Sequence, residues 1–341
     1  MVQDKAATQE HAATQAVAPR RRSETWHRLV FALILAFLLL VIVLLPFALG
    51  SLMGYVLRPQ SNRVYSLLGA GASPDPSHVR LHLDVLSVDE WGRSVQIRVS
   101  GNHICEQRCQ FSDQVVFVAS PESGDLAEGL PASDSVDLPS SGSRATQTIT
   151  LPVVGQPVLF PFDTYRLGLG VMLHRVAADG SSQDLSENDA RGRLFLSMQT
   201  HVSRAIMHDP APESAQALGL ETPGSEYVGT WAVTFERPAY LKILTILLVL
   251  LVVVAASYAV FLRPLAELVI NAGALVLGVW GIRSILLGSS PPNGTLVDIA
   301  LSMVIFFLLI AIATRALSFH RSRGDVRLRR RKPASPADDE P

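Results

Sequence analysis

Three long apolar runs lie near the end of this chain of 341 residues, and they constrain its fold more than any other feature. The runs cover residues 240–262, 265–287 and 296–317. As helices rising about 1.5 Å per residue, each would extend roughly 30 Å, which is the thickness of the hydrocarbon core of a bilayer. Only Arg263 and Pro264 separate the first two runs, and residues 288–295 separate the last two. Such short connections predict three antiparallel transmembrane helices.

A fourth apolar run, residues 29–57, lies near the start of the chain. The polar segment before it, residues 1–28, lacks apolar periodicity and is expected to be disordered. Arginines precede the run, as they do in a secretory signal peptide, but the run is about twice as long as the apolar region of such a peptide. We therefore predict an uncleaved transmembrane helix, with cleavage as the alternative.

The distribution of charge predicts the orientation of these helices. Residues 58–238 hold 13 basic and 21 acidic residues, a balance of about −8, whereas the tail 318–341 holds 7 basic and 4 acidic residues. Basic flanks stay in the cytoplasm according to the positive-inside rule. We expect both termini in the cytoplasm and residues 58–238 outside it. Arginine greatly outnumbers lysine, which hints at a GC-rich bacterial genome. We expect the chain in the cytoplasmic membrane of a bacterium.

Residues 58–238 show the period of two that is typical of β-strands. Val79, Leu81, Leu83 and Val85 alternate with polar residues. Val95, Ile97 and Val99 repeat the pattern, as do Val116 and Val118. About seven such segments predict an antiparallel β-sandwich. Residues 206–227 are expected to form a loop with a helical turn near 213–218. The predicted fold class is therefore an α plus β membrane protein, with a β-sandwich between one N-terminal and three C-terminal transmembrane helices.

Cys105 and Cys109 are the two cysteines of the chain. Outside the cytoplasm a close pair favours a disulfide, which here would close a small loop between two strands. Free thiols are one alternative. A metal site with His103, His78 or His82 is another, although no second C-x-x-C motif accompanies the pair.

No motif indicates catalysis. The chain lacks a G-x-S-x-G elbow, a phosphate-binding loop and an H-E-x-x-H helix, and we expect neither enzymatic activity nor a cofactor. A catalytic triad assembled from distant residues is left open. The histidines of the middle segment could sense pH, because imidazole titrates near pH 6.5, or they could simply be exposed strand and loop residues. They are His78, His82, His103, His174, His201 and His208.

The most distinctive motif outside the membrane is Phe160-Pro161-Phe162-Asp163-Thr164-Tyr165. We interpret it as a rigid corner with aromatic residues, in which Asp163 bonds to nearby backbone amides. With the three C-terminal helices and the segment 280–284, the motif resembles a family of uncharacterised bacterial four-span membrane proteins. The resemblance covers about residues 29–317. It implies the architecture just described and no established activity.

The F-P-F-D corner is also similar to one in pentameric ligand-gated channels, whose ectodomain is a β-sandwich with a disulfide loop. Those receptors carry four helices after the ectodomain, whereas this chain is predicted to have one before it and three after it. Their cysteine loop is also much longer than the three residues between Cys105 and Cys109. We attribute the likeness to a shared way of turning a strand.

Polar residues within the predicted membrane helices suggest two structural features. Residues that are small or polar share one face of the third predicted helix and predict a packing seam: Glu267, Asn271, Ala274, Gly278 and Gly281. Arg283 and Asp298 lie about one turn from the short connection between their helices, so they predict an ion pair. An ion or proton pathway is the alternative, but the other predicted helices offer no ionisable residue at mid-membrane.

The arginine-rich tail predicts a cytoplasmic topology signal that could also contact anionic lipid. Nucleic-acid binding is not expected, because the basic cluster is short and lacks interleaved aromatic residues. The sequence favours a non-catalytic binding, sensing or scaffolding module at the outer face of the membrane, with an unidentified protein or ligand as partner. An oligomeric channel or transporter component and a membrane-bound enzyme are the alternatives, and the chain could form a homo-oligomer.

Overall fold

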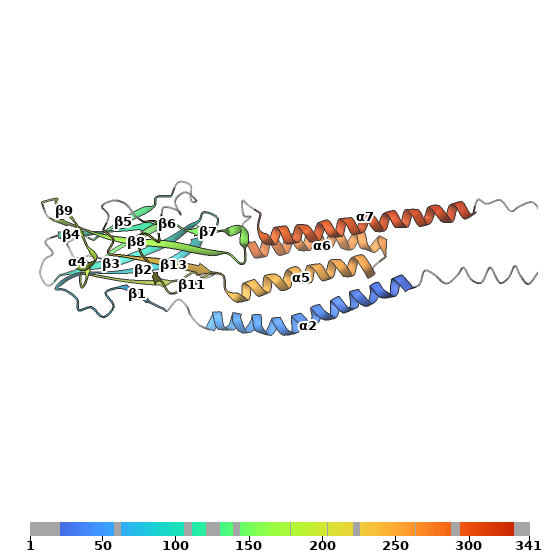
Figure 1. The fold of residues 1–341 in the computed structure, drawn as a ribbon, viewed down its shortest axis with the longest axis horizontal. Coiled ribbons are helices and arrows are strands. Elements are labelled where there is room, and N and C mark those ends of the chain that lie inside the picture. The colour runs from blue at the N-terminus through green and yellow to red at the C-terminus, as the bar shows by residue number, and fades with distance from the viewer. Residues whose placement is uncertain are drawn as a thin grey trace, which may run out of the picture. The chain divides into compact units, whose positions relative to one another are not determined.

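The computed structural model describes residues 21–57, 63–105, 111–120, 130–138, 144–177, 179–202, 204–220, 226–262, 264–287 and 294–330. The chain forms two compact units. One consists of Phe47–Ile243 with Pro291–Leu296, and the other of Met1–Pro46, Leu244–Ser290 and Val297–Pro341. The first unit contains the strands, which we call the β-domain, and the second contains most of the helical residues (Figure 1).

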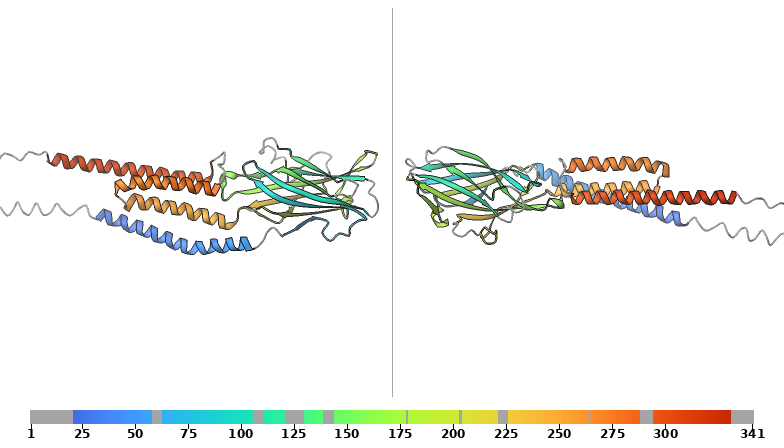
Figure 2. Two further views of the ribbon diagram at one scale, coloured as in Figure 1. Left: turned by 180° about the vertical axis from the view of Figure 1, so that it is seen from behind. Right: turned by 90° about the horizontal axis from the view of Figure 1, so that it is seen from above.

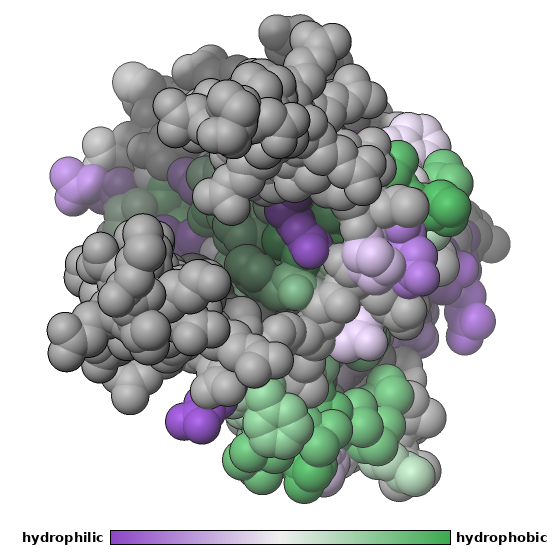
Figure 3. Space-filling view, turned by 90° about the vertical axis from the view of Figure 1, so that its right-hand side faces the viewer, coloured by the Kyte–Doolittle hydropathy of each residue, from purple (hydrophilic) through white to green (hydrophobic). Residues whose placement is uncertain are grey.

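Four long helices follow the apolar runs of the sequence: α2 (Arg21–Leu57), α5 (Ala239–Leu262), α6 (Leu265–Leu287) and α7 (Leu296–Arg330). Each contains a stretch that is long and apolar enough to cross a membrane. Figure 3 shows hydrophobic residues on the surface of the face that it presents. The expectation of disorder up to residue 28 is wrong for its last part, because α2 already begins at Arg21. Likewise α7 continues past residue 317 to Arg330.

The helices of the second unit pack through small side chains. Ala256 and Ala259 of α5 meet Leu268 and Ala272 of α6, and Leu308 of α7 completes this buried cluster. Alanine allows two helix backbones to approach closely, which favours association in lipid. The guanidinium group of Arg315 in α7 donates to the carbonyl oxygen of Val260, one of the carbonyl groups in the last turn of α5 that lack a partner within the helix.

Thirteen strands make up the described part of the β-domain. They are β1 (Tyr65–Leu68), β2 (Ser77–Asp89), β3 (Ser94–Cys105), β4 (Phe111–Ala119), β5 (Ser133–Leu138), β6 (Ala145–Pro152), β7 (Val154–Gly155), β8 (Thr164–Ala177), β9 (Ser182–Leu185), β10 (Leu194–Thr200), β11 (Ile206–Met207), β12 (Ala211–Pro212) and β13 (Gly229–Glu236). The 3₁₀ turn η2 (Pro157–Leu159) precedes β8, and the short helix α4 (Glu187–Ala190) precedes β10.

The strands form two sheets that face each other (Figure 2). The five-stranded sheet has the order β1-β10-β2-β3-β6. The eight-stranded sheet has the order β11-β13-β8-β4-β5, with β12 beside β13 and with β7 and β9 beside β8. The predicted sandwich is therefore present, with one correction to its antiparallel character, because β10 runs parallel to β2. After β9, which still belongs to the eight-stranded sheet, the chain passes through α4 and enters the five-stranded sheet as β10.

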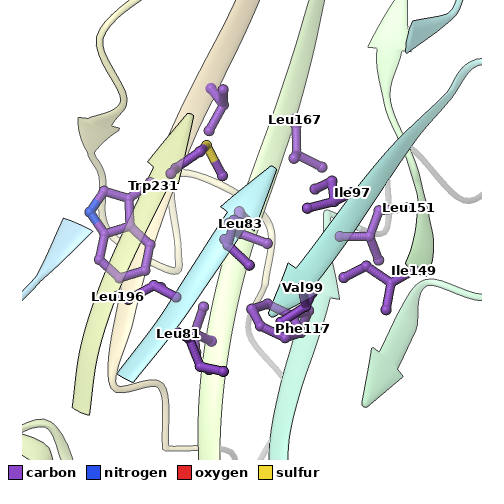
Figure 4. Packing of buried hydrophobic residues seen from close by; sticks show 14 of the residues in the cluster. Leu81, Leu83, Ile97, Val99, Phe117, Ile149, Leu151, Leu167, Leu196 and Trp231 are labelled. Carbon is purple, nitrogen blue, oxygen red and sulfur yellow. The ribbon is translucent and has the colours of Figure 1, made fainter. Parts of the chain in front are cut away.

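The inner faces of the two sheets form one hydrophobic core. Leu83 and Ile97 of one sheet and Phe117 and Leu167 of the other are fully buried, and Figure 4 shows these side chains meeting between the sheets. The alternation that the sequence shows in β2 and β3 therefore corresponds to an inward and an outward face, as expected for a half-buried strand.

The register of β4 differs from the prediction. Val115 and Phe117 point into the core, whereas Val116 and Val118 lie on the outer face. The two faces of β4 are both apolar, because the segment after β12 covers part of the outer face. Val118 packs there against Leu218, Leu220 and other residues of that segment. Because the outer face of β4 is also apolar, the sequence did not show which of its residues point into the core.

The segment 206–227 is more regular than a loop. It contributes β11 and β12 to the eight-stranded sheet. The helical turn expected near residues 213–218 is present, since the N–H of Leu218 donates to the carbonyl oxygen of Ser214 at 3.2 Å. This turn places Leu218 and Leu220 over Ala232 of β13.

Truncating the core should destabilise the β-domain. Phe117→Ala removes a fully buried ring between the sheets, and we expect a loss of about 3–5 kcal/mol in the free energy of unfolding. Urea unfolding of the full-length protein in detergent, followed by circular dichroism, measures this loss. Thr148→Ala, an exposed position of β6, is the matched control and should change stability by less than about 0.5 kcal/mol. Equal effects of the two substitutions would contradict the assigned register.

Candidate functional site

The predicted corner lies at the end of the β-domain from which α5 leaves, which we call the α5 end. Phe160 and Asp163 are buried, whereas Phe162 is 45% exposed. The peptide bond between Phe160 and Pro161 is cis. Tyr165 lies within β8 and packs into the core. Of the aromatic residues of the motif, Phe160 and Tyr165 therefore point inward, whereas Phe162 points outward.

The partner of Asp163 is Arg237, which follows β13 and is only 5% exposed. Its Nε lies 3.2 Å from both carboxylate oxygens of Asp163, and its Nη2 donates to Oδ2 at 3.1 Å. A second carboxylate, Glu90 after β2, also contacts Nη2. The guanidinium carbon lies 5.1 Å from the centre of the Phe160 ring. Asp163 therefore binds an arginine side chain rather than the backbone amides that the sequence suggested.

Hydrogen bonds and neighbouring carboxylates keep the guanidinium group of Arg237 charged. Burial by itself lowers the pKa of Arg237, but hydrogen bonds and the charges of Asp163 and Glu90 outweigh it and raise that pKa. Burial and the neighbouring Asp163 also raise the pKa of Tyr165, so its phenol stays neutral. A cavity of about 140 Å³ lies beside these residues, lined in part by Arg204. It is smaller than the roughly 300 Å³ of the smallest typical ligand pockets. The corner is a structural junction.

Removing Arg237 should be costly. Arg237→Ala leaves the carboxylate of Asp163 buried without its counter-charge, and we expect a loss of about 3–5 kcal/mol in unfolding free energy. Arg166→Ala is the matched control, because it breaks an ion pair with Glu213 whose side chains are 50% and 31% exposed. Such exposed pairs contribute about 0–1 kcal/mol. Chemical unfolding of both variants in detergent measures the difference, and a loss below 1 kcal/mol for Arg237→Ala would contradict the proposed junction.

A second buried polar cluster lies at the opposite end of the β-domain, which we call the Cys105 end. His103 Nε2 lies 3.6 Å from Asp113 Oδ2 and 3.1 Å from Ser77 Oγ. Arg175 Nε donates to the other oxygen of Asp113 at 3.1 Å, and its guanidinium carbon lies 3.7 Å from the centre of the Phe111 ring. The side chains of His103 and Asp113 are at most 1% exposed.

These residues place a serine, a histidine and an aspartate together, but not in the geometry of a catalytic triad. In a triad the serine and the aspartate contact different nitrogens of the imidazole. Here both contact Nε2, and Nδ1 has no hydrogen-bond partner among the described residues. The imidazole is also closed off from solvent. This arrangement therefore gives the serine no activated base.

The cysteine pair lies at the same end. Cys105 is the last residue of β3, and its Sγ lies 3.3 Å from Ser77 Oγ. Cys109 lies outside the described residues. The disulfide between them stays a prediction.

His103 should make the stability of the β-domain depend on pH. Burial lowers the pKa of His103, which outweighs the opposing charge of Asp113, and Arg175 and His78 lower it further. The unfolded chain takes up a proton near pH 6.5, as an ordinary histidine does, while the folded chain resists it. Stability is therefore lost as the pH falls from about 7 through this window, by at most about 1.4 kcal/mol per pH unit from this group.

Thermal unfolding between pH 7.5 and 5 measures this dependence. His103→Gln keeps a polar side chain but cannot be protonated, so its melting temperature should fall less on acidification than that of the unchanged protein. Identical pH profiles for the two proteins would refute the role assigned to His103.

An open groove on the outer face of the five-stranded sheet is the best candidate for a binding site. Its volume is about 300 Å³, which is at the lower end of the range for ligand sites. It is lined by Arg80, Leu81, His82, Ser100, Gly101, Asn102, Arg144, Ala145, Thr146 and Ser197. The lining residues lie on β2, β3, β6 and β10, except Arg144, which directly precedes β6.

The groove has a positive, hydrogen-bonding character. None of the described residues that line it is acidic. The guanidinium carbon of Arg80 lies 5.9 Å from the centre of the Phe195 ring. Neither Arg80 nor Arg144 forms an ion pair within the described part of the chain. Hydroxyl groups and the amide of Asn102 add neutral donors and acceptors. Two guanidinium groups that form no ion pair among the described residues, next to polar side chains, suit an anionic ligand.

Asp84, which is 8% exposed, lies beside the groove and contacts the residues around it. His82 Nε2 lies 3.2 Å from the Asp84 carboxylate, and His82 Nδ1 lies 2.8 Å from Ser197 Oγ. Gln199 and Arg98 donate to the same carboxylate at 2.5 Å and 3.4 Å. This network fixes the imidazole and the hydroxyl group that line the groove.

Within the helical unit, the predicted pair is in contact. Arg283 Nε donates to Asp298 Oδ1 at 2.5 Å, and Nη2 lies 3.5 Å from Oδ2. Both side chains are partly buried. The pair joins the end of α6 to the start of α7, which favours the structural interpretation over a pathway.

The packing seam predicted from the sequence lies on α6. Its members are exposed, and a Cβ added at Gly278 or Gly281 would meet nothing within 4 Å. The opposite face of α6, with Leu268, Ala272 and Val279, is the buried one. Periodicity defines a face of a helix, but the neighbouring helices decide which face is covered.

No three metal-ligating side chains within the described ranges are arranged to hold a metal ion. The alternative metal site at Cys105 therefore gains no support, although Cys109 is not described. Sequence reasoning missed Arg237 and Glu90 at the corner and Arg80 and Arg144 in the groove. The position of Arg237 between a strand and an apolar run was one available signal, but nothing local identified its partners.

Comparison of the sequence with protein-family models gives no match, and comparison with curated proteins gives none. The chain is therefore described by its architecture, a β-rich domain between one N-terminal and three C-terminal apolar helices.

Proposed function

We propose that this chain is a multi-span membrane protein whose β-domain is a non-catalytic binding module for a small polar anion. The observation that carries the proposal is the groove of about 300 Å³ in which Arg80 and Arg144 form no ion pair with any described residue and no described lining residue is acidic. Charge-assisted hydrogen bonds from guanidinium groups to carboxylate or phosphate are among the strongest that a protein surface forms. The hydroxyl groups and the amide of the lining suit a ligand that also carries hydroxyl groups, such as an acidic sugar.

The chemistry of the rest of the β-domain supports binding over catalysis. The serine, histidine and aspartate at the Cys105 end are closed off and wrongly arranged for a triad. The groove contains His82, but its two nitrogens are occupied by Asp84 and Ser197. An imidazole held in this way orients a ligand more readily than it takes a proton from one.

The finer placement is part of the same proposal. The basic flanks put both termini in the cytoplasm of a bacterium and the β-domain outside it. A disulfide between Cys105 and Cys109 would suit that compartment. The groove would then face the periplasm or the cell exterior, and the chain would be a member of the uncharacterised bacterial four-span family.

Calorimetric titration of the full-length protein in lipid nanodiscs tests the proposal. The probes are inorganic phosphate, citrate and trigalacturonate, with maltotriose as the neutral comparison. We expect at least one anion to bind and the neutral sugar not to bind. The double variant Arg80→Gln, Arg144→Gln should lower the affinity about tenfold or more, since each lost charged hydrogen bond is worth about 1.5–3 kcal/mol.

The matched control is Arg166→Gln with Arg193→Gln, which removes the same net charge at two exposed ion pairs away from the groove. This control should bind as the unchanged protein does. Failure of all three anions to bind, or equal loss in both double variants, would refute a specific anion site.

A further inference from the structure

Between α2 and α5, exposed apolar side chains are concentrated on one short segment. Among the described residues from 63 to 237, four large hydrophobic side chains are exposed, and three of them are Val158, Leu159 and Phe162, at 42%, 43% and 45%. The fourth is Val64. We call the three the apolar tip. Single exposed hydrophobic residues need no explanation, but three within five positions form a patch.

The tip has few backbone groups that need water. The N–H of Leu159 donates to the Gln156 carbonyl oxygen at 3.0 Å, that of Phe160 to Pro157 at 3.2 Å, and that of Phe162 to Leu159 at 2.8 Å. Pro157 and Pro161 have no N–H group. Residues 157–162 also carry no charged side chain. A segment that satisfies three of its four N–H groups and lacks charge loses little when it leaves water.

The tip is held beside the start of α5. Asp163, directly after the tip, binds Arg237, and Thr164 pairs with Glu236. Only Pro238 separates Arg237 from Ala239, where both α5 and its candidate membrane span begin. The first residues of a spanning helix lie at the surface of the hydrocarbon core. The buried ion pair therefore keeps the tip near the level at which the chain enters the bilayer.

The first turn of α5 has the composition of a membrane interface. Tyr240 and Lys242 are amphipathic side chains of the kind that concentrate between head groups and acyl chains. Valine, leucine and phenylalanine beside them suit the same layer. The apolar tip and the first turn of α5 thus both carry side chains that are typical of a membrane interface.

We infer that the apolar tip, Val158, Leu159 and Phe162, inserts into the boundary between head groups and acyl chains of the leaflet at which α5 begins. The tip then ties the β-domain to the membrane in addition to the covalent connection through Pro238. The inference is independent of the anion groove, because it involves neither Arg80 nor Arg144.

Fluorescence quenching in nanodiscs tests this contact. An environment-sensitive fluorescent amino acid replaces Leu159 in the full-length protein, and the same amino acid at Ser182, an exposed residue of β9 at the other end of β8, is the control. Phosphatidylcholine nanodiscs carry a doxyl quencher on either the fifth or the sixteenth acyl carbon. We expect blue-shifted emission at position 159 and a loss of at least about half of it to the shallow quencher, because interfacial segments lie roughly 5–10 Å deep.

The deep quencher should act more weakly at position 159, and neither should act at position 182. Adding Val158→Asp and Phe162→Asp to the position 159 probe should abolish the quenching while α5 still spans the bilayer. Emission that resembles that of the control would overturn the inference. Blue-shifted emission that no lipid quencher reduces would overturn it too, because it would mean that protein covers the tip.

Discussion

The buried contact of Arg237 with Asp163 and Glu90 organises the α5 end of the β-domain. Asp163 precedes β8 in the eight-stranded sheet, Glu90 follows β2 in the five-stranded sheet, and Arg237 lies between β13 and α5. One guanidinium group therefore joins both sheets to the start of a candidate membrane span. Buried ion pairs contribute little net stability compared with apolar packing, but they strongly penalise arrangements in which one partner is left alone. The contact thus specifies where α5 leaves the sandwich.

The Cys105 end repeats this principle with different residues. His103 of the five-stranded sheet meets Asp113 and Arg175 of the other sheet. Between the two ends the facing side chains are almost entirely aliphatic or aromatic. Polar groups that are buried at either end of the sandwich need hydrogen-bonding partners. In each polar cluster, these partners come from both sheets, so the cluster links one sheet to the other.

The outer faces of the two sheets differ, and that difference directs the functional proposal. Part of the eight-stranded sheet is covered by Leu218 and Leu220. The five-stranded sheet instead presents the groove with Arg80 and Arg144, beside the network of Asp84. The proposal of an anion site rests on these two arginines, which form no ion pair among the described residues. The network of Asp84 already orients His82 and Ser197, which lowers the entropic cost of binding a ligand there. The proposed ligand site and the proposed lipid contact therefore occupy separate parts of the β-domain.

The sequence by itself determined the features that depend on local periodicity. Apolar runs of sufficient length located α2, α5, α6 and α7, and a period of two located β2 and β3, because helix and strand geometry repeat within a few residues. Tertiary structure decided which faces are covered and which charges meet. Asp163 and Arg237 are 74 residues apart, the face of α6 that packs is set by α5 and α7, and both faces of β4 are apolar because a distant segment covers one of them. Such pairings follow from how the chain returns on itself, which no local pattern records.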